Sequence, residues 1–249
     1  MTDLTTATGL TAAANLRRGL LITFEGPEGS GKTTLIQGIA ALLKEAGTEP
    51  LLIREPGGTE IGERIRNILL DRASDAMSAE TELLLMVASR AQLVREKIKP
   101  ALAAGRVILC DRFADASVAY QGYGRQLGEE TVNRLNEVAL GGLSNAGGVT
   151  PKLTFLCLLP PEIGQKRLEN RATDRLDHES ALFHARVYTG YEAMANSGDS
   201  RFQVIDASKT PEQMLAETMG HFTRRLAEME QAMAKKLAES LVKILLKDQ

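Results

Sequence analysis

The segment that most constrains this chain is FEGPEGSGKTT, which spans residues 24–34 and directly follows an apolar run. The stretch from Gly26 to Thr33 matches G-x-x-x-x-G-K-[ST] at every fixed position. Glycines let backbone N–H groups turn inward around phosphate oxygens with no Cβ in the way. A helical pattern, TTLIQGIAALLKEAG, comes next. We therefore predict a strand, a phosphate-binding loop and a helix, in that order.

This loop predicts a nucleotide site with a role for each residue type. Lys32 would offer a mobile cation to the β- and γ-phosphates, and Thr33 would offer a hydroxyl to Mg²⁺. The residues expected to hold ATP are Gly26, Pro27, Glu28, Gly29, Ser30, Gly31, Lys32, Thr33 and Thr34. The loop does not say what happens to the nucleotide, because kinases, switches, motors and transport ATPases share it.

Four further runs resemble the first apolar run, Leu20–Phe24. They are PLLIREPGG, RVILCDR, LTFLCLL (Leu153–Leu159) and FQVID (Phe202–Asp206). Continuous apolar runs are typical of parallel strands that are buried on both faces. The segments between them, such as Ala79 to Ala104, are long enough to be crossover helices. This order predicts an α/β domain with helices on both faces of the sheet.

Composition excludes several classes of protein. The net charge of −2 gives no general nucleic-acid footprint, and no apolar run approaches the roughly 18 residues of a membrane helix. The only cysteines, Cys110 and Cys157, both lie in apolar runs. We expect buried free thiols, with no disulfide framework and no cysteine-based zinc site.

We divide the chain into three parts. Residues 1–18 are expected to be a flexible leader rather than a transit peptide, because they hold two basic residues and the acidic Asp3, and the cytoplasm is the default location. Residues 19–225 form one domain, since a strand-like run directly follows the loop Gly141–Pro151. Residues 226–249 form a helical extension, which would pack on its own domain or on a partner subunit, or less favourably on a membrane surface. Its apolar stripe is Leu226, Met229, Met233, Leu237, Leu241 and Ile244.

Charged residues follow two of the other strands and suggest a second anion site. Arg54 ends the second run, and Asp111 and Arg112 end the third. The carboxyl ends of parallel strands meet at one edge, so these side chains should face Lys32. Asp111 would order Mg²⁺ or its waters and Arg112 would bind a second phosphate, unless the two simply form an ion pair.

Two other clusters leave alternatives open. Arg90, in the polar SRAQ of a helical segment, is either a solvated turn or an anion ligand that reaches into a cleft. The charged segment Arg167–Ser180 is either a solvated loop or a mobile lid whose arginine meets the transferring phosphoryl group.

Taken together, FEGPEGSGKTT, REPGGT, SRAQLV, IKPAL, DRFADASVAYQG and RATDRLDHES resemble the bacterial thymidylate kinase family, in that family's order. The resemblance covers roughly Leu20 to Arg225. It implies transfer of the γ-phosphoryl group of ATP to dTMP with Mg²⁺, giving dTDP. It also implies a P-loop NTPase fold, three-layered α/β/α, with a five-stranded parallel sheet and a mobile lid, usually as a homodimer.

By motif position, the resemblance also implies roles for single residues. Arg54, Arg90 and Arg112 would serve the dTMP side, while Ser117 and Gln121 would face the thymine edge. Glu28 would lie near the deoxyribose 3′-OH or the metal. The lid would supply the catalytic arginine, as either Arg171 or Arg175. Met86 stands where the family often stacks a phenylalanine on thymine, and a methionine can pack softly on a ring face.

Two rival functions fit the same loop. A deoxynucleoside kinase has a hydroxyl acceptor and needs a carboxylate base, for which Glu55 is the candidate. A switch or regulatory ATPase would hydrolyse nucleotide with no small-molecule acceptor.

Overall fold

The computed structural model describes residues 19–141, 148–168 and 174–245, with side chains up to residue 229. The strands are β1 (Leu20–Glu25), β2 (Leu51–Arg54), β3 (Val107–Asp111), β4 (Leu153–Leu158) and β5 (Phe202–Asp206). The α-helices are α2 (Lys32–Glu45), α3 (Glu60–Leu70), α4 (Ala79–Leu93), α5 (Lys99–Ala103), α6 (Ala114–Ser117), α7 (Glu129–Leu140), α8 (Pro161–Leu168), α9 (Ala181–Ala195) and α10 (Pro211–Leu245). A 3₁₀ turn, η1 (Arg72–Ser74), and two π-helical turns, η2 (Val94–Ile98) and η3 (Val118–Gly124), join them.

The strands form one parallel sheet in the order β2-β3-β1-β4-β5, which confirms the predicted sheet and its five runs. The central strand β1 has β3 on one side and β4 on the other. The chain therefore changes direction along the sheet beside the carboxyl end of β1. In open α/β sheets, this is where ligands bind.

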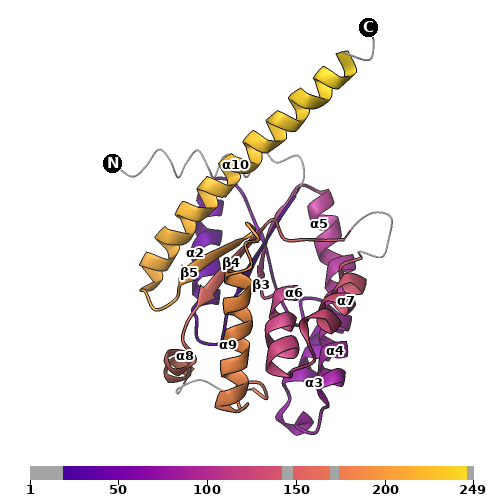
Figure 1. The fold of residues 1–249 in the computed structure, drawn as a ribbon, viewed down its shortest axis with the longest axis vertical. Helices are drawn as coiled ribbons and strands as arrows, with labels where there is room; N and C mark the ends of the chain where they lie inside the picture. The colour runs from indigo at the N-terminus through magenta and orange to yellow at the C-terminus, as the bar shows by residue number, and fades with distance from the viewer. Residues whose placement is uncertain (1–18, 142–147, 169–173, 246–249) are drawn as a thin grey trace.

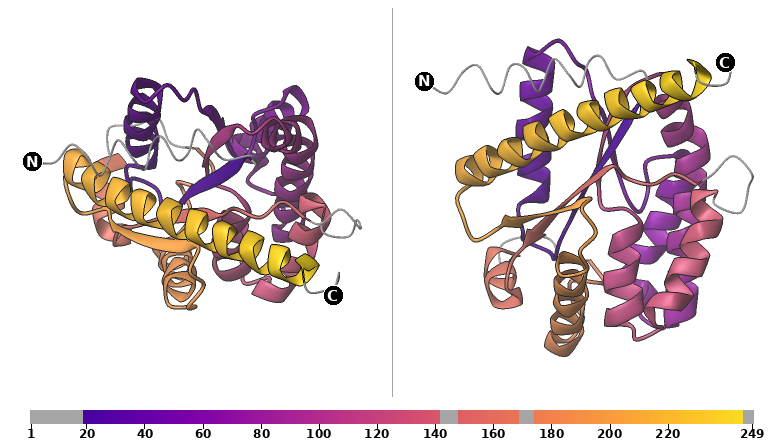
Figure 2. Two further views of the ribbon diagram at one scale, coloured as in Figure 1. Left: turned by 90° about the horizontal axis from the view of Figure 1, so that it is seen from above. Right: turned by 45° about the horizontal axis from the view of Figure 1, so that its top comes forward.

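Helices cover both faces of the sheet because successive strand residues point to opposite sides. On one face, Leu20, Ile22 and Phe24 of β1 pack with α2 and α10. On the other face, Leu21 of β1 packs beside η2 and α5, while α4, α7, η3 and α9 share a neighbouring core. Figure 1 and the turned views in Figure 2 show α2 and α10 together, with α3, α4 and α7 on the opposite side.

Local sequence signals set several helix starts near the site. The hydroxyl of Thr59 accepts a hydrogen bond from the N–H of Gly62 at the start of α3, and Ser78 caps α4 through the N–H of Thr81. Ser180 does the same for α9 through Phe183. Such caps satisfy N–H groups that a helix cannot bond internally.

The helix α10 runs without a break across the expected boundary at residue 225. Leu226 is buried in the same core as Phe222, and Met229 packs against it. Beyond that point α10 continues past the sheet (Figure 1). The leader and the side chains of Met233, Leu237, Leu241 and Ile244 lie outside the described residues, so the three-part division stays a prediction.

Candidate active site

The loop between β1 and α2 has the geometry of a phosphate cradle. Gly26 has φ 137° and Gly29 has φ 73°, a region of backbone conformation that side chains disfavour. A Cβ on Gly26 would lie 2.2 Å from the carbonyl oxygen of Cys157, and one on Gly29 would lie 2.7 Å from that of Gly164. Only glycine fits either position, so the loop can present its backbone N–H groups inward.

Lys32 is buried in this loop and held by oxygen atoms. Its Nζ donates to the carbonyl oxygens of Gly26 at 3.1 Å and Pro27 at 2.8 Å, and to Oγ of Ser30 at 3.1 Å. Burial, together with the nearby Arg112, lowers the pKa of Lys32 below its ordinary value. An anion placed beside it would compensate that cost, so the ammonium is arranged to receive phosphate.

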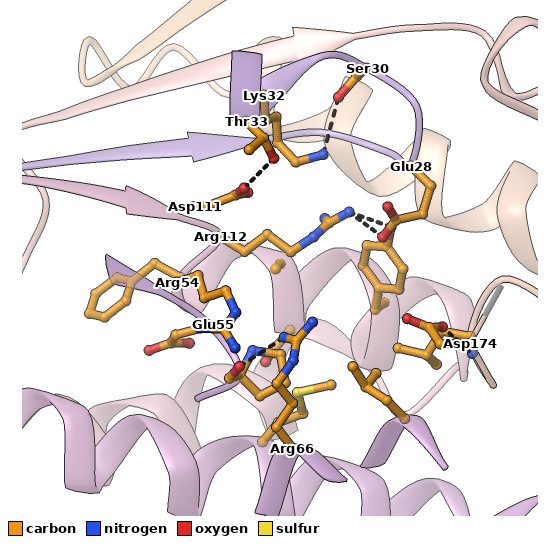
Figure 3. Close-up of a pocket in the computed structure, with 18 of the residues that line it drawn as sticks. Glu28, Ser30, Lys32, Thr33, Arg54, Glu55, Arg66, Asp111, Arg112 and Asp174 are labelled. Carbon is orange, nitrogen blue, oxygen red and sulfur yellow. Dashed lines mark hydrogen bonds and ion pairs between the residues drawn. The ribbon is translucent and has the colours of Figure 1, made fainter. Parts of the chain in front are cut away.

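Thr33 and Asp111 meet across the top of the sheet. The hydroxyl of Thr33 donates to Oδ2 of Asp111 at 3.0 Å (Figure 3). A hydroxyl, a carboxylate, phosphate oxygens and waters together are a ligand set that suits Mg²⁺. In the described part of the chain, no group of three or more His, Cys, Asp or Glu side chains could hold a metal by itself. These two residues therefore fit a metal that reaches the site with a nucleotide.

Arg112 has an uncommon backbone conformation that turns its side chain toward the phosphate loop. Its φ is 65°, in the left-handed region. The guanidinium donates to the carbonyl oxygen of Gly26 at 2.8 Å, to the hydroxyls of Tyr120 and Tyr191 at 3.1 Å each, and to Glu28 at 2.6 Å. Although burial opposes its charge, Glu28 and the two tyrosine oxygens raise the pKa of Arg112 well above its ordinary value. Arg112 is thus a permanent cation beside Lys32.

One cavity of about 370 Å³ joins these groups to the expected acceptor residues. It is lined by Glu28 to Thr34 of the loop, by Asp111, and by Arg54, Met86, Arg90, Arg112, Ser117 and Gln121. In Figure 3, Arg112 lies between Lys32 above and Arg66 below. The cavity therefore brings together the expected binding residues that the structure describes, except Gly26 and Pro27, which belong to the loop but do not line the cavity.

Arg90 is almost fully buried, so it is not a solvated turn. Its guanidinium pairs with Glu55 at 2.6 Å and donates to Oδ1 of Asn136, to the carbonyl oxygen of Phe113 and to the hydroxyl of Ser117. Oε1 of Glu55 is buried and has no hydrogen-bond partner among the described residues. Burial raises the pKa of Glu55, although Arg90 opposes that effect.

The cavity also contains a cation that sequence reasoning missed. Arg66 of α3 lines it and donates to the carbonyl oxygen of Pro56 at 2.9 Å. Burial and the neighbouring Arg54 lower the pKa of Arg66. Arg54 itself is half exposed and pairs with Glu63 at 2.8 Å. Two arginines that repel each other beside an open cavity favour an anion there.

Of the two expected lid arginines, the structure describes only Arg175. Arg171 lies outside the described residues. Arg175 is buried, pairs with Glu82 at 2.5 Å and donates through Nε to the carbonyl oxygen of Leu69 at 2.9 Å. Arg175 does not line the central cavity, although its neighbours Asp174 and Leu176 do. Which lid arginine acts in catalysis stays a prediction.

A second hollow opens on the other side of the loop. It is lined by Gly29, Gly31, Thr34, Arg167 and the turn 208–211. Arg167, which sequence reasoning did not single out for a site role, donates to the carbonyl oxygens of Gly29 and Ala207 at 3.2 and 2.9 Å. A group that continues from the phosphates past Gly31 would enter this hollow.

Comparison with known protein families identifies the family of this chain. A family model described as thymidylate kinase matches residues 24–218, which include the loop, Arg112 and α9. The chain belongs to the thymidylate kinase family.

Relatives agree with this assignment. A thymidylate kinase from Bacillus licheniformis is 46% identical over 200 residues, covering 79% of this chain and 92% of the relative. One from Geotalea uraniireducens is 46% identical over 217 residues, covering 84% and 99%. A crystal structure of thymidylate kinase from Ehrlichia chaffeensis matches with a TM-score of 0.65 and 29% identity, covering 82% and 97%.

Met86 takes the place expected for a phenylalanine, and it packs with Leu69 and Leu176 in a small core beside the cavity. In the described residues, no helix is both long and apolar enough to cross a membrane.

Proposed function

We propose that this thymidylate kinase family member transfers the γ-phosphoryl group of ATP to dTMP, giving dTDP and ADP. The observation that carries the proposal is the single cavity shared by the phosphate loop and the acceptor residues. Two separate nucleotides can then meet with their phosphates side by side, so a phosphorus centre passes directly between them.

The donor side rests on the loop and the hollow beside it. Gly26 to Thr34 would surround the phosphates of ATP, with Lys32 at the β- and γ-phosphates. The hollow at Arg167 and residues 208–211 would take the adenosine end. Thr33 and Asp111 would hold Mg²⁺, which neutralises the charge that develops on the transferring group.

The acceptor side rests on cations that surround the remaining space. Arg54, Arg66 and Arg112 would share the dTMP phosphate, and Glu28, now paired with Arg112, would turn toward the sugar. Arg90, Ser117 and Gln121 would meet the base edge, while Met86 would pack on its ring. A lid arginine would complete the charge around the transferring group.

These residues suit an acceptor that is already an anion. A phosphate monoester needs no general base, only alignment and neutralisation of charge. Glu55 is the carboxylate that a hydroxyl acceptor would require, and one of its oxygens already accepts from Arg90. That ion pair favours the phosphate acceptor over the hydroxyl acceptor of a deoxynucleoside kinase.

One assay tests the proposal. The protein is incubated with ATP and Mg²⁺, and with dTMP, thymidine or no acceptor, and the products are separated by chromatography. We expect ADP and dTDP in equal amounts with dTMP only. Exclusive use of thymidine would support the hydroxyl-acceptor rival, and equal ATP hydrolysis in all three reactions would support a regulatory ATPase.

We also propose that the protein works as a homodimer in the cytoplasm, with residues 1–18 as a leader and 226–249 as an extension of the 19–225 domain. Light scattering of the full chain tests the dimer, and a truncation after Met229 tests the extension. We expect that truncation to keep kinase activity, because it retains the part of α10 from Met214 to Met229 that packs on the core of the sheet.

A further inference from the structure

Glu82 is a fully buried carboxylate that makes several hydrogen bonds close to the base-binding residues, without lining the cavity. It lies in the first turn of α4, where the helix dipole favours an anion. Its Oε1 accepts from Nε2 of Gln121 at 2.8 Å and from Nε of Arg125 at 3.1 Å. Its Oε2 accepts from Arg125 at 2.8 Å and from Arg175 at 2.5 Å. Nothing in the proposed transfer uses this group.

The charge of Glu82 decides which way the amide of Gln121 faces. Burial opposes ionisation, but hydrogen bonds from Arg125, Gln121 and Arg175 outweigh it and lower the pKa of Glu82. An ionised carboxylate only accepts hydrogen bonds. The amide must therefore turn its NH₂ toward Glu82, since its oxygen would face the carboxylate with no proton between them.

The other end of the amide is left for the cavity. Gln121 lines the cavity, and no described residue is seen to donate to its Oε1. Four of the five N–H groups of nearby Arg90 are engaged, which leaves one donor. An acceptor beside a donor matches the N3–H and O4 of thymine. Cytosine presents the reverse, with an acceptor at N3 and an amino group at C4.

We propose that Glu82 is a positioning residue for base selection, which fixes the Gln121 amide so that its oxygen reads N3–H and cytosine is rejected. This inference rests on the proposed function and deepens it. Glu82 also holds Arg175, which belongs to the predicted lid Arg167–Ser180, and Arg125, which pairs with Glu179 at 2.6 Å. The same carboxylate thus ties the base-reading turn η3 to the segment 174–180.

The substitution Glu82→Gln should weaken the preference of the cavity for thymine over cytosine. Arg125 and Arg175 both donate to Oε2, whereas Oε1 accepts from only one arginine nitrogen, Nε of Arg125, so the oxygen of the new side chain should keep the Oε2 position and its NH₂ should face Gln121. Two NH₂ groups cannot bond, and the Gln121 amide turns over to offer its oxygen instead. The cavity then presents a donor where it had an acceptor, so it opposes the N3–H of thymine and suits the N3 of cytosine, while the free donor of Arg90 still faces the amino group of cytosine.

The experiment measures kcat/KM for dTMP and dCMP in the full chain. In Glu82→Gln we expect the dTMP-to-dCMP ratio to fall about tenfold to hundredfold, mainly through a lower kcat/KM for dTMP, whereas general damage to the fold would lower both values alike and leave the ratio unchanged. Gln121→Leu should lower the ratio as well, and adding Glu82→Gln to it should change the ratio no further. Glu179→Gln removes a carboxylate from the same cluster without touching Gln121, and it should leave the ratio unchanged.

Two results would overturn the inference while dTMP phosphorylation by the wild type stands. One is an unchanged dTMP-to-dCMP ratio in Glu82→Gln. The other is a change in that ratio that is as large when Glu82→Gln is added to Gln121→Leu as when it is made in the wild type. Wild-type failure to use either nucleotide would contradict the proposed function and, with it, this inference. Should Glu82→Gln not fold, the side-chain amide protons of Gln121 decide the matter in the wild type by NMR. Slow solvent exchange of these protons in the free protein, unaltered by dTMP, supports the contact with Glu82. Protons that exchange fast in the free protein and slow down only when dTMP binds would refute it.

Discussion

Replacing Glu25 with glutamine should remove a pH dependence from the stability of this protein. Glu25 ends β1 and is fully buried. Its Oε1 accepts from the N–H of Phe113 at 2.7 Å, and its Oε2 lies 3.1 Å from the hydroxyl of Tyr191. Burial and the charge of Asp115 raise the pKa of Glu25 from 4.5 to about 8, although Arg112 opposes the shift. Near neutral pH the folded protein therefore holds a protonated carboxyl at this position.

The sign and size of the effect follow from that shift. Between pH 4.5 and 8 the folded state keeps a proton that the unfolded chain has lost, so the free energy of unfolding falls as pH rises. At about 1.4 kcal/mol per pKa unit, the loss across this window is on the order of 5 kcal/mol. Glutamine has the shape of the protonated acid and no charge to lose, so Glu25→Gln should escape this loss.

Urea denaturation at pH 5, 6, 7 and 8 measures the effect for both proteins. Carboxyls that do not interact with Glu25 contribute alike in the two proteins, so they cancel in the difference. With an m value of about 2–3 kcal/mol/M, the midpoint of the variant should rise relative to the wild type by about 1–2 M between pH 5 and 8. Two pH profiles that run parallel across this range would refute the reasoning.

Further predictions concern catalysis. Lys32→Ala should lower kcat at least about a hundredfold while the protein stays folded, and a wild-type rate would remove Lys32 from the mechanism. Arg112→Lys keeps the charge but loses the planar fork, so steady-state kinetics should show a higher KM for dTMP and a lower kcat together, by about tenfold or more each. Arg66→Met should raise the KM for dTMP about tenfold and leave that for ATP alone; the matched Arg64→Met, on the exposed side of α3, should change neither. EDTA should abolish turnover and Mg²⁺ restore it, and activity in excess EDTA would exclude the metal role given to Thr33 and Asp111.

Much of the fold was predictable because burial on both faces leaves a plain mark on a strand. Leu21 and Ile22 point to opposite cores, so both must be apolar, and the same holds for Ile108 and Leu109. The loop after β1 was predictable because its glycines are required by positive φ angles, a local property that a fixed spacing in the sequence records. The start of α10 at Pro211 had a signal too, since proline suits the first turn of a helix.

Helix-borne site residues were harder to find. Arg66, Glu82 and Arg167 occur among other charged residues at ordinary helical spacing, and sequence alone does not say which side of a helix meets a cleft. That side depends on how α3, α4 and α8 pack on the sheet. Arg90 was easier, because a polar group interrupted an apolar stripe, but its pairing with Glu55 required two segments to meet in space.

The contact between the phosphate loop and α8 has a mechanical consequence. Gly29 and Gly164 face each other so closely that a methyl group on either would collide with the backbone of the opposite segment. The two segments meet backbone against backbone, with no side chain between them that could change its rotamer. A shift of the loop by about a bond length should therefore also move the first turn of α8. A nucleotide that changes the conformation of the phosphate loop would therefore also change the position of α8.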